Sequence, residues 1–367
     1  MLWGREKVPV GLDISHDCIK VVKLRRTDSK IILDAIGMTK ISPEPLDEDA
    51  LGAKQELSVK AIKNLLVTHK IDTKKVRSSV SGNSVVVRYI KLPYMSETEL
   101  KDVIKFEAEE HIPFDIEHVI IDFQIIKETV EKDERMILVL LVAAKEELIY
   151  DHMEILHRAG LETVHINVDT FATEDALTYG VGEEDVIALV DIGARMTNIN
   201  VVENKISCFN RDVLVGGNDF TEGIRRELGV SFQEAEKIKE EEGIILLPEE
   251  ITTAVTPAVT GSDKAAQISY AIESVGARLL DELERSFAYY YTQLPVYRKN
   301  IDRVIISGGS AKLANLDNFL SNGLGMSVVI GDPFAKISIP PKFDQTYIKK
   351  VSSAFAVSLG LAMKGVM

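Results

Sequence analysis

The stretch VPVGLDISHDCIKVVKL, Val8 to Leu24, decides the fold of this chain. Apolar residues alternate with polar ones on both sides of the short polar segment Ser15-His16-Asp17, and this pattern predicts a β-hairpin with a tight turn. Asp13 stands just before that turn, at the end of an otherwise apolar strand. Because a buried carboxylate is costly unless something pairs with it, Asp13 is a candidate site residue.

The same pattern occurs a second time near the middle of the chain. LVDIGARMTNIN (Leu189–Asn200) aligns with GLDISHDCIKVV (Gly11–Val22), so that Asp13 falls on Asp191. Each copy is followed by a polar turn and a further apolar strand. The repeat therefore predicts two hairpins, each with an acid at its tight turn, in two related lobes that face each other.

Composition and charge limit the functional class. The chain has 367 residues, which predicts more than one core, and its formal net charge of −14 argues against a nucleic-acid partner. Its two cysteines, Cys18 and Cys208, are too few for a disulfide framework and indicate a reducing compartment. The first residues lack the apolar segment of a secretory signal, and the longest apolar runs fall short of the roughly 18 residues needed to span a bilayer. We therefore expect a cytoplasmic protein that reaches a membrane only through a partner.

The rest of the chain alternates strand and helix patterns, which predicts an α/β fold. Val85–Leu92 has the pattern of a strand, and the capping-box sequence Ser96-Glu-Thr-Glu99 begins a helix that runs to about His111. The charge runs Glu107–Glu110 and Lys237–Glu242 are interpreted as solvated helix faces. A long amphipathic helix has apolar residues along one stripe, which are Ile268, Ile272, Val275, Leu279, Leu283 and Phe287.

Three features have the chemistry of a phosphate and metal site. The backbone N–H groups of a hairpin turn can bind phosphate oxygens, and a nearby carboxylate such as Asp13 is compatible with them when Mg²⁺ and its water lie between. Lys20 follows seven residues later, and the returning strand can bring its charge to the same phosphates. Gly308-Gly309 follows a strand and lets the backbone approach a flat ligand. Each feature also has a plain structural interpretation, as a turn residue, a surface lysine or a helix entry.

Together these motifs resemble a known nucleotide fold. Asp13 with Lys20, the Asp-x-Gly-x-x-x-Thr pattern of the second hairpin and a late Ser-Gly-Gly are similar to the motifs of actin, heat-shock chaperones and sugar kinases. A more specific resemblance is to PilM, the family of actin-like type IV pilus assembly proteins. It rests on VRYIKLPYMSETELKDVIKFEAEEHIPFDIEHVIIDFQII (Val87–Ile126) and continues through VDTFATEDAL, VLVGGNDFTEGI and VIISGGSAKLANL.

The resemblance implies an actin-like, ribonuclease H-like fold of two lobes, with an inserted subdomain of the kind found in PilM and FtsA proteins. The parts it implies are the first-lobe core (1–82 and 159–182), the inserted subdomain (83–158), the second-lobe core (183–227 and 301–367) and a helical subdomain (228–300).

ATP with Mg²⁺, bound between the lobes, is the ligand that the resemblance implies. Asp13 and Asp191 would hold the metal through its water. Asp169 stands where hydrolysing relatives place the residue that orients the attacking water; a helix N-cap is the other interpretation, and both stay open. The residues carried over to the nucleotide are Asp13, Ser15, Lys20, Asp191, Gly193, Arg195, Thr197, Gly216, Gly217, Gly308, Gly309 and Ser310.

The chain departs from hydrolysing relatives at both turns. Ser15 stands where they often have glycine, so its Cβ narrows the approach of phosphate, and Asp17 adds negative charge if it faces the ligand. Ala194-Arg195 replaces a Gly-Gly or Asp-Gly pair, and Arg195 has two interpretations, a phosphate ligand or a solvated side chain. These changes weaken the case for rapid hydrolysis more than the case for binding. We therefore expect ATP binding with slow or absent turnover.

The resemblance also implies a partner. PilM-like proteins bind the cytoplasmic N-terminal peptide of PilN-like inner-membrane proteins, in a groove between the first lobe and the inserted subdomain. The function expected is thus an ATP-binding scaffold that couples nucleotide state to the pilus machinery. The candidate groove residues are Val85, Val87, Tyr89, Ile104 and Phe106.

Other partners and functions stay open at this point. A PilO-like protein, the assembly ATPases, the platform protein and a second copy of the chain are further candidate partners. The alternatives to a scaffold are a filament-forming ATPase like FtsA and a small-molecule kinase of the same fold. A kinase needs a substrate base and a polar sugar pocket, and neither is visible in the sequence.

Overall fold

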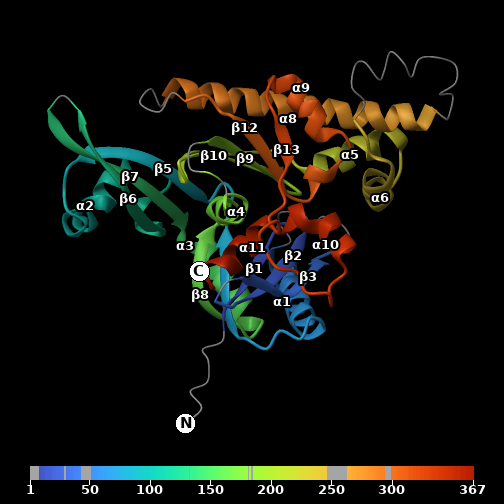
Figure 1. Cartoon of the computed structure of the whole chain (residues 1–367), viewed down its shortest axis with the longest axis horizontal. Helices are drawn as coiled ribbons and strands as arrows, with labels where there is room; N and C mark the ends of the chain where they lie inside the picture. Colours follow the sequence, from blue (N-terminus) through green and yellow to red (C-terminus); the bar gives the residue numbers. More distant parts are fainter. Residues whose placement is uncertain are drawn as a thin grey trace, which may run out of the picture.

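The computed structural model describes residues 8–28, 30–42, 51–131, 133–180, 182, 185–245, 263–293 and 299–367. Its framework is two five-stranded sheets and a smaller three-stranded sheet. The two large sheets form two lobes, one above the other in Figure 1, and the small sheet projects to one side. Two parts of the predicted helical subdomain, 246–262 and 294–298, lie outside the described residues.

The first lobe is built on the sheet with strand order β3-β2-β1-β4-β8. Its first two strands form the predicted hairpin, in which Asp13 lies directly opposite Lys20. Helices α1 and α3 pack on one face of this sheet, and α11 covers the other. The elements are β1 Val10–Ile14, β2 Cys18–Arg26, β3 Ile31–Lys40, α1 Leu51–Thr68, β4 Lys75–Val80, α3 Glu146–Arg158, β8 Glu162–Val168, α10 Gln345–Val351, η4 Ser352–Phe355 and α11 Ala356–Met363.

The second lobe repeats this arrangement, because its strand order β11-β10-β9-β12-β13 matches that of the first lobe position by position. The predicted second hairpin is therefore confirmed as β9 and β10, with Asp191 opposite Asn198. The elements are β9 Val186–Ile192, β10 Thr197–Glu203, β11 Ile206–Val213, α5 Gly217–Leu228, α6 Phe232–Glu242, α8 Asp263–Gln293, β12 Arg303–Ser307, η3 Ser310–Lys312, α9 Leu316–Leu324 and β13 Val328–Ile330.

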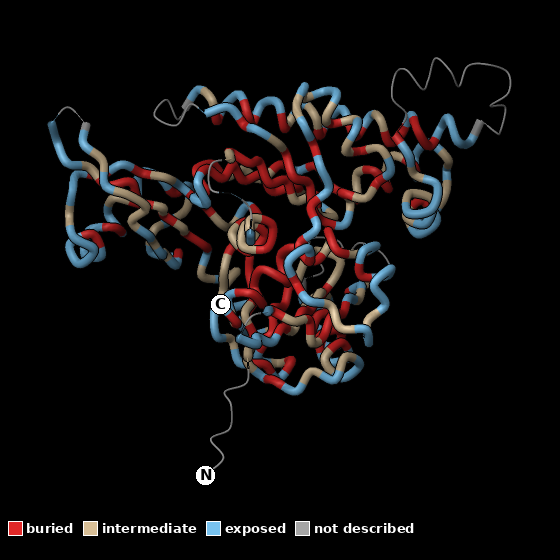
Figure 2. The backbone as a smooth tube through the Cα atoms, in the orientation of Figure 1, coloured by how far each residue is buried: buried red, intermediate tan, exposed pale blue. Residues whose placement is uncertain are grey.

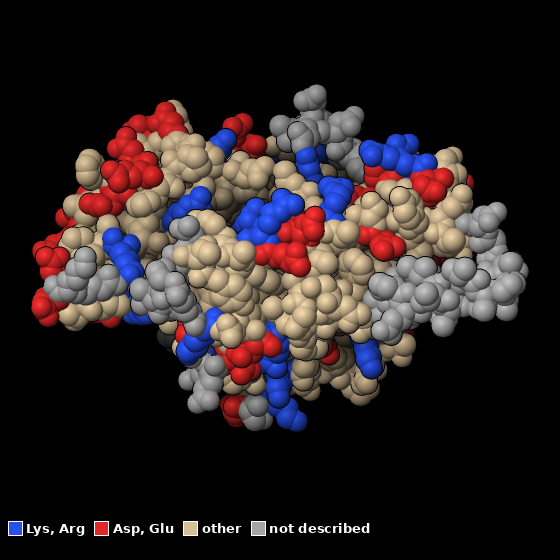
Figure 3. All heavy atoms as spheres, turned by 90° about the horizontal axis from the view of Figure 1, so that it is seen from above, with Lys and Arg blue, Asp and Glu red and all other residues tan. Residues whose placement is uncertain are grey.

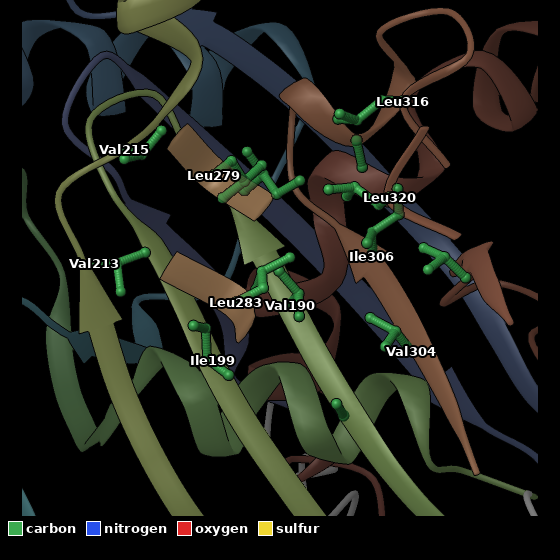
Figure 4. Close-up of a cluster of buried hydrophobic side chains, with 14 of the residues drawn as sticks. Val190, Ile199, Val213, Val215, Leu279, Leu283, Val304, Ile306, Leu316 and Leu320 are labelled. Carbon is green, nitrogen blue, oxygen red and sulfur yellow. The ribbon is translucent and has the colours of Figure 1, made fainter. Parts of the chain in front are cut away.

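The core of the second lobe lies between its sheet and α8. All six apolar residues of the predicted stripe are buried in it, because their spacing puts them on one face of the helix. Figure 4 shows Leu279 and Leu283 of α8 meeting Val190 and Ile199 of the sheet. The periodicity of this segment was therefore sufficient to predict both the helix and its buried face.

The projecting unit consists of the sheet β5-β7-β6 and helix α2, which covers one of its faces. The predicted capping box is confirmed, since Ser96 and Glu99 exchange side-chain and backbone hydrogen bonds at the start of α2. Acidic side chains gather on the outer edge of this unit, at the left of Figure 3. Its elements are β5 Val85–Pro93, α2 Glu97–Glu109, η1 Ile116–His118, β6 Val119–Glu131 and β7 Glu134–Lys145.

Helices α4 (Asp169–Leu177) and α11 lie between the two large sheets, in the centre of Figure 1. They pack closely because Gly360 has no side chain: a Cβ there would lie 1.8 Å from the carbonyl oxygen of Ala172. The tube in Figure 2 is buried along both sheets and these two helices. The two helices thus connect the lobes, since α4 contacts β9 and β10 of the second lobe and α11 contacts β1 and β2 of the first. Among the described residues no helix is long and apolar enough to cross a membrane.

Candidate functional site between the two lobes

Three carboxylates from different elements approach one another between the lobes. Asp13 and Asp191 are the second-last residues of β1 and β9, and Asp169 is the first residue of α4. Burial raises the pKa of Asp169 to about 6, and the neighbouring charges of Asp13 and Asp191 act in the same direction. Burial also raises the pKa of Asp191, although Ser307 donates a hydrogen bond to it at 2.6 Å. The site therefore concentrates negative charge in a region of limited solvent access.

A lysine of the first hairpin offsets this charge. Lys20 Nζ lies 2.8 Å from Asp13 Oδ2 and also donates to Ser15 Oγ at 2.8 Å, while Ser15 Oγ donates to Asp13 Oδ1 at 2.7 Å. Burial lowers the pKa of Lys20, but the charge of Asp13 and its hydrogen bond, together with the charges of Cys18 and Asp191, raise the pKa overall. The returning strand thus places Lys20 beside Asp13, and the pair is nearly shielded from solvent. The predicted contact of Lys20 with phosphates stays a prediction.

Asp169 does not cap the helix that it begins. Val168 is the N-cap residue of α4, and no side chain there makes a capping hydrogen bond. The carboxylate of Asp169 instead accepts a hydrogen bond from Ser81 Oγ at 2.6 Å. It is thereby held among the acids of the interlobe site. The N-cap interpretation is excluded, whereas a role in orienting water stays a prediction.

The tips of the two hairpins touch each other across the lobes. Arg195 Nη1 of the second tip lies 3.2 Å from His16 Nε2 of the first. His16 Nδ1 lies 2.6 Å from Asp17 Oδ1, and Asn218 Nδ2, in the first turn of α5, donates to Asp17 Oδ2 at 2.9 Å. Because arginine can only donate, His16 Nε2 accepts, so the ring proton is on Nδ1 and points to Asp17.

The carboxylate of Asp17 is thus used by the protein itself. Burial raises its pKa, but the hydrogen bonds from His16 and Asn218 outweigh burial and lower the pKa below its usual value. Asp17, whose negative charge concerned us near the phosphates, instead accepts a hydrogen bond from Asn218 of the other lobe. Arg195 takes part in the same contact through His16, and its role as a phosphate ligand stays a prediction.

The glycine-rich turns lie on the second-lobe side of the site. Gly308 has a φ of +90°, and a Cβ there would lie 2.3 Å from the carbonyl oxygen of Ile192, so only glycine fits. Gly216 packs against Ala194 and Arg195, where a Cβ would lie 2.6 Å from the nearest backbone atom. These close approaches bring both turns to the second hairpin.

Gly217 and Ser310 come from segments far apart in the sequence and meet here. A Cβ at Gly217 would lie 2.3 Å from Ser310 Oγ. Gly217 N–H donates to the carbonyl of Gly193 at 2.8 Å, so the start of α5 is held on the second hairpin. Gly309 has open space where a side chain would be. The structure therefore brings the second-lobe candidates together.

Thr197 supports this turn from behind. Its hydroxyl is buried and donates to the carbonyl of Val215 at 2.7 Å. It therefore holds the backbone that leads into Gly216.

Two residues of α6 that pack beside this turn were not predicted as site residues from the sequence. Lys239 of α6 donates to the carbonyl of Gly217 at 3.0 Å and to Glu236 at 2.7 Å, and both side chains are largely buried. Lys239 belongs to the charge run that was interpreted as a solvated face, and Glu236 directly precedes that run. The interpretation holds for Glu240, which is exposed. The available signal was that Glu236 and Lys239 are three residues apart and so can pair on one helix face, next to the buried Ala235.

The candidate groove residues fall on different faces of the inserted subdomain. Ile104 is buried in the core between α2 and the sheet, and Phe106 is 75% exposed on the outer face of α2. Val85, Val87 and Tyr89 alternate with the core residues of β5, so they point to the opposite face of the sheet. The structure does not bring all five into one surface.

The sheet face opposite α2 looks toward the two lobes. Strand register places Val85 in a row with Ile120, and Val87 in a row with Asp122. The charge of Asp122 acts on His165 of β8, so this end of the face adjoins the edge strand of the first lobe. Exposed Ile120 and these rows therefore line the junction between the inserted subdomain and the first lobe.

The fold and the site define the class of actin-like proteins, in which two lobes of matching sheet order meet at two acidic hairpins. Two solved structures of the same fold are similar to this chain. One is the ethanolamine utilization protein EutJ from Carboxydothermus hydrogenoformans (14% identity, TM-score 0.55), covering 98% of this chain and 90% of that chain. The other is MreB 5 of Spiroplasma citri bound to AMPPNP (14% identity, TM-score 0.51), covering 98% of this chain and 96% of that chain.

The family is more specific than the fold. The family model described as type IV pilus assembly protein PilM matches residues 11–366, and the chain belongs to this family. A solved PilM-PilN type IV pilus biogenesis complex contains a similar chain, with 26% identity and a TM-score of 0.82 over 99% of this chain and 100% of that chain. The resemblance inferred from the sequence is confirmed.

The residues present suit a nucleotide with a divalent cation. Lys20 is paired with Asp13 and its charge acts on Asp191, while the pKa of Asp169 and of Asp191 is raised by burial and by the neighbouring acids. A further cation among these acids would lower the electrostatic cost of this arrangement. In the described part of the chain, no three His, Cys, Asp or Glu side chains are grouped so that they could hold a metal ion by themselves.

Proposed function

We propose that this protein binds ATP with Mg²⁺ between its lobes and acts as a cytoplasmic scaffold of the type IV pilus inner-membrane assembly platform. The observation that carries the nucleotide part is the convergence of Asp13, Asp169 and Asp191, with the cation of Lys20 paired to Asp13 and acting on Asp191. Membership of the PilM family favours this function over a filament-forming ATPase or a kinase.

Each end of the site has a distinct role in this proposal. Lys20 binds phosphate oxygens, and Asp13 and Asp191 hold Mg²⁺ through its water. Gly216, Gly217, Gly308, Gly309 and Ser310 hold the ribose and adenine, with Lys239 and Glu236 beside them. Mg²⁺ supplies charge neutralisation for the phosphates.

Slow or absent hydrolysis fits the geometry of the first hairpin. Ser15 Oγ is engaged with Asp13, and Ser15 N–H donates to the carbonyl of Cys18 at 2.9 Å. This N–H is therefore used by the turn and is not available to a phosphate. We expect less than about one turnover per second, measured as phosphate release.

Calorimetry with Mg·ATP tests the nucleotide part. Lys20→Met removes the charge at the phosphate end and should weaken binding about tenfold or more. Lys23→Met is the matched control, because Lys23 lies on the same strand but pairs with Asp34 and Asp72 at the surface. It should change the affinity less than about threefold. Equal affinities for the two variants would contradict the proposed site.

The partner is proposed to be the N-terminal cytoplasmic peptide of a PilN-like membrane protein, through which the scaffold reaches the membrane. The similar chain of the solved PilM-PilN complex supports this partner. We place the peptide on the sheet face opposite α2, along Val85, Val87 and Ile120, where an edge strand of the first lobe adjoins the inserted sheet. Extended peptides gain main-chain hydrogen bonds at such edges.

A peptide titration distinguishes the two faces of the inserted subdomain. Ile120→Asp should weaken peptide binding at least about tenfold, because it places a charge in the proposed groove. Phe106→Asp changes the outer face of α2 and should have little effect. If Phe106→Asp weakened peptide binding more than Ile120→Asp, the peptide would bind at α2 instead. If the unaltered protein did not bind the peptide, the proposed partner would be wrong.

A further inference from the structure

A line of four side chains runs from the inserted subdomain to the interlobe helix. Tyr89 Oη of β5 donates to Ser207 Oγ of β11 at 2.5 Å, and Ser207 Oγ donates to Asn200 Oδ1 of β10 at 2.6 Å. Asn200 Nδ2 then donates to Glu174 Oε2 of α4 at 2.9 Å. We call these four residues the Tyr89–Glu174 chain. Every donor points in the same direction, and the series ends on a carboxyl group.

The two middle residues of the Tyr89–Glu174 chain are closed to solvent. Asn200 is 2% exposed and Ser207 is 6% exposed. Water therefore cannot replace a hydrogen bond that is lost there, and a buried polar group left without a partner is costly. β5, the second-lobe sheet and α4 must consequently keep their relative positions or lose a buried hydrogen bond.

The same helix also begins at the acidic site. α4 carries Asp169 at its first position and Glu174 five residues later, and a helix this short moves as one body. Asp169 accepts from Ser81, which follows β4 of the first lobe and stands four residues before β5. α4 is thus bonded both to the segment that leads into β5 and, through the Tyr89–Glu174 chain, to β5 itself.

We infer that the Tyr89–Glu174 chain couples the inserted subdomain to the interlobe site through α4. This inference rests on the proposed function, because it assigns a route by which an occupant of the site and a partner on the inserted subdomain affect each other. A ligand that shifts Asp169 moves α4, and the buried hydrogen bonds transmit the shift to β5. Such coupling is reciprocal, so a partner that displaces β5 changes the affinity of the interlobe site by the same factor.

The test begins with hydrogen exchange in the absence of nucleotide. Tyr89→Phe removes only the hydroxyl that starts the chain and keeps the ring. Tyr94→Phe is the control, because Tyr94 lies in the same subdomain, is exposed and stacks on Arg135 through its ring. We expect exchange at residues 169–177 to be at least about threefold faster in Tyr89→Phe and unchanged in Tyr94→Phe. Unchanged exchange at α4 in Tyr89→Phe would overturn the inference.

A second arm adds Mg·ATP and measures exchange at residues 85–93. Nucleotide should slow exchange there in the unaltered protein and in Tyr94→Phe, and this response should be lost in Tyr89→Phe. If calorimetry shows that ATP binds but these residues do not respond, the coupling is refuted. If ATP does not bind at all, the nucleotide part of the proposed function fails. Exchange at α4 without nucleotide then still decides whether the Tyr89–Glu174 chain couples the inserted subdomain to α4.

Discussion

The two hairpins of the interlobe site share a backbone and differ in chemistry. In each, an aspartate is the second-last residue of its strand, and the residue two positions later donates its N–H across the turn. Ser15 donates to Cys18 at 2.9 Å in the first hairpin, and Gly193 donates to Met196 at 3.0 Å in the second. The repeat seen in the sequence is therefore a repeat of hydrogen-bond geometry.

The residue opposite each aspartate is where the halves differ. Asp13 faces Lys20 and forms an ion pair with it, whereas Asp191 faces Asn198, whose amide donates to Asp212 instead. The positive charge beside the acids therefore comes from Lys20 of the first lobe. The comparison shows that two hairpins can keep the same turn geometry and the same aspartate while only one of them also carries a lysine paired with its acid.

The largest effect should come from removing that charge. Lys20→Met leaves Asp13 buried without its partner, beside two further acids, and should lower the free energy of unfolding by about 3 to 5 kcal/mol. Urea unfolding measures this change. Adding Asp13→Asn should recover a large part of the loss, because it removes the unpaired charge. A double variant no more stable than Lys20→Met would show that packing, not charge, dominates.

Two glycines of similar conformation provide the next contrast. Gly82 and Gly308 have φ values of +91° and +90°, but their surroundings differ. A Cβ at Gly308 would lie 2.3 Å from a backbone oxygen, whereas a Cβ at Gly82 would lie 3.5 Å from the side chain of Met196. Gly308→Ala should cost about 3 kcal/mol and Gly82→Ala about 1 kcal/mol. Thermal unfolding of the two variants measures these losses of stability. Equal losses would mean that the positive φ alone sets the penalty for alanine.

A pH effect should come from Glu174 of the interlobe helix. Burial raises the pKa of Glu174 to about 7; the hydrogen bond from Asn200 and the charge of Lys364 lower it, and Asp175 raises it. A raised pKa means that the folded state binds the proton more tightly. Stability from this group is therefore greatest at low pH and is lost as the pH rises from about 4.5 to about 7.

Glu174→Gln keeps the acceptor oxygen for Asn200 and removes the titration. It should stabilise the protein by roughly 2 kcal/mol at pH 8 and by little at pH 5. Unfolding curves across this range, with exposed Glu109→Gln as the control, measure the difference. A parallel pH profile for Glu174→Gln and the unaltered protein would refute the assignment.

The smallest effect is expected at the contact between the hairpin tips. Arg195→Ala removes an exposed hydrogen bond to His16 and should change the free energy of unfolding by less than about 0.5 kcal/mol. Asn218→Ala removes a partner of the partly buried Asp17 and should cost about 1 kcal/mol. An Arg195 variant as destabilised as Asn218→Ala would mean that the two tips hold the lobes together more strongly than their exposure indicates.

Local patterns predicted much of this structure. The hairpins, the capping box at Ser96 and the buried stripe of α8 follow from alternation, spacing and side-chain chemistry within a few residues. The return of Lys20 along the second strand was equally accessible, because a hairpin register is set by its own turn, but its ion pair with Asp13 was not predicted. The family resemblance was carried by whole segments of the inserted subdomain and is confirmed.

Other residues could not be placed in this way. Lys239 looked like one charge in a solvated run, and its contact with Gly217 depends on how α6 packs against α5. Tyr89 and Phe106 were assigned to one groove, but the sheet separates their faces. Such errors arise because spacing within an element gives a face, while the neighbour of that face is chosen by long-range packing.

The amino-acid sequence by itself determined the two acidic hairpins, the actin-like class and the PilM family, because each depends on local hydrogen bonding or on motifs within continuous segments. Only the tertiary structure decided that Asp17 and Arg195 join the lobes and that Tyr89 reaches Glu174. These contacts join segments that lie far apart in the sequence. Their geometry is set by the packing of α4 and α11 between the sheets, which no local pattern records.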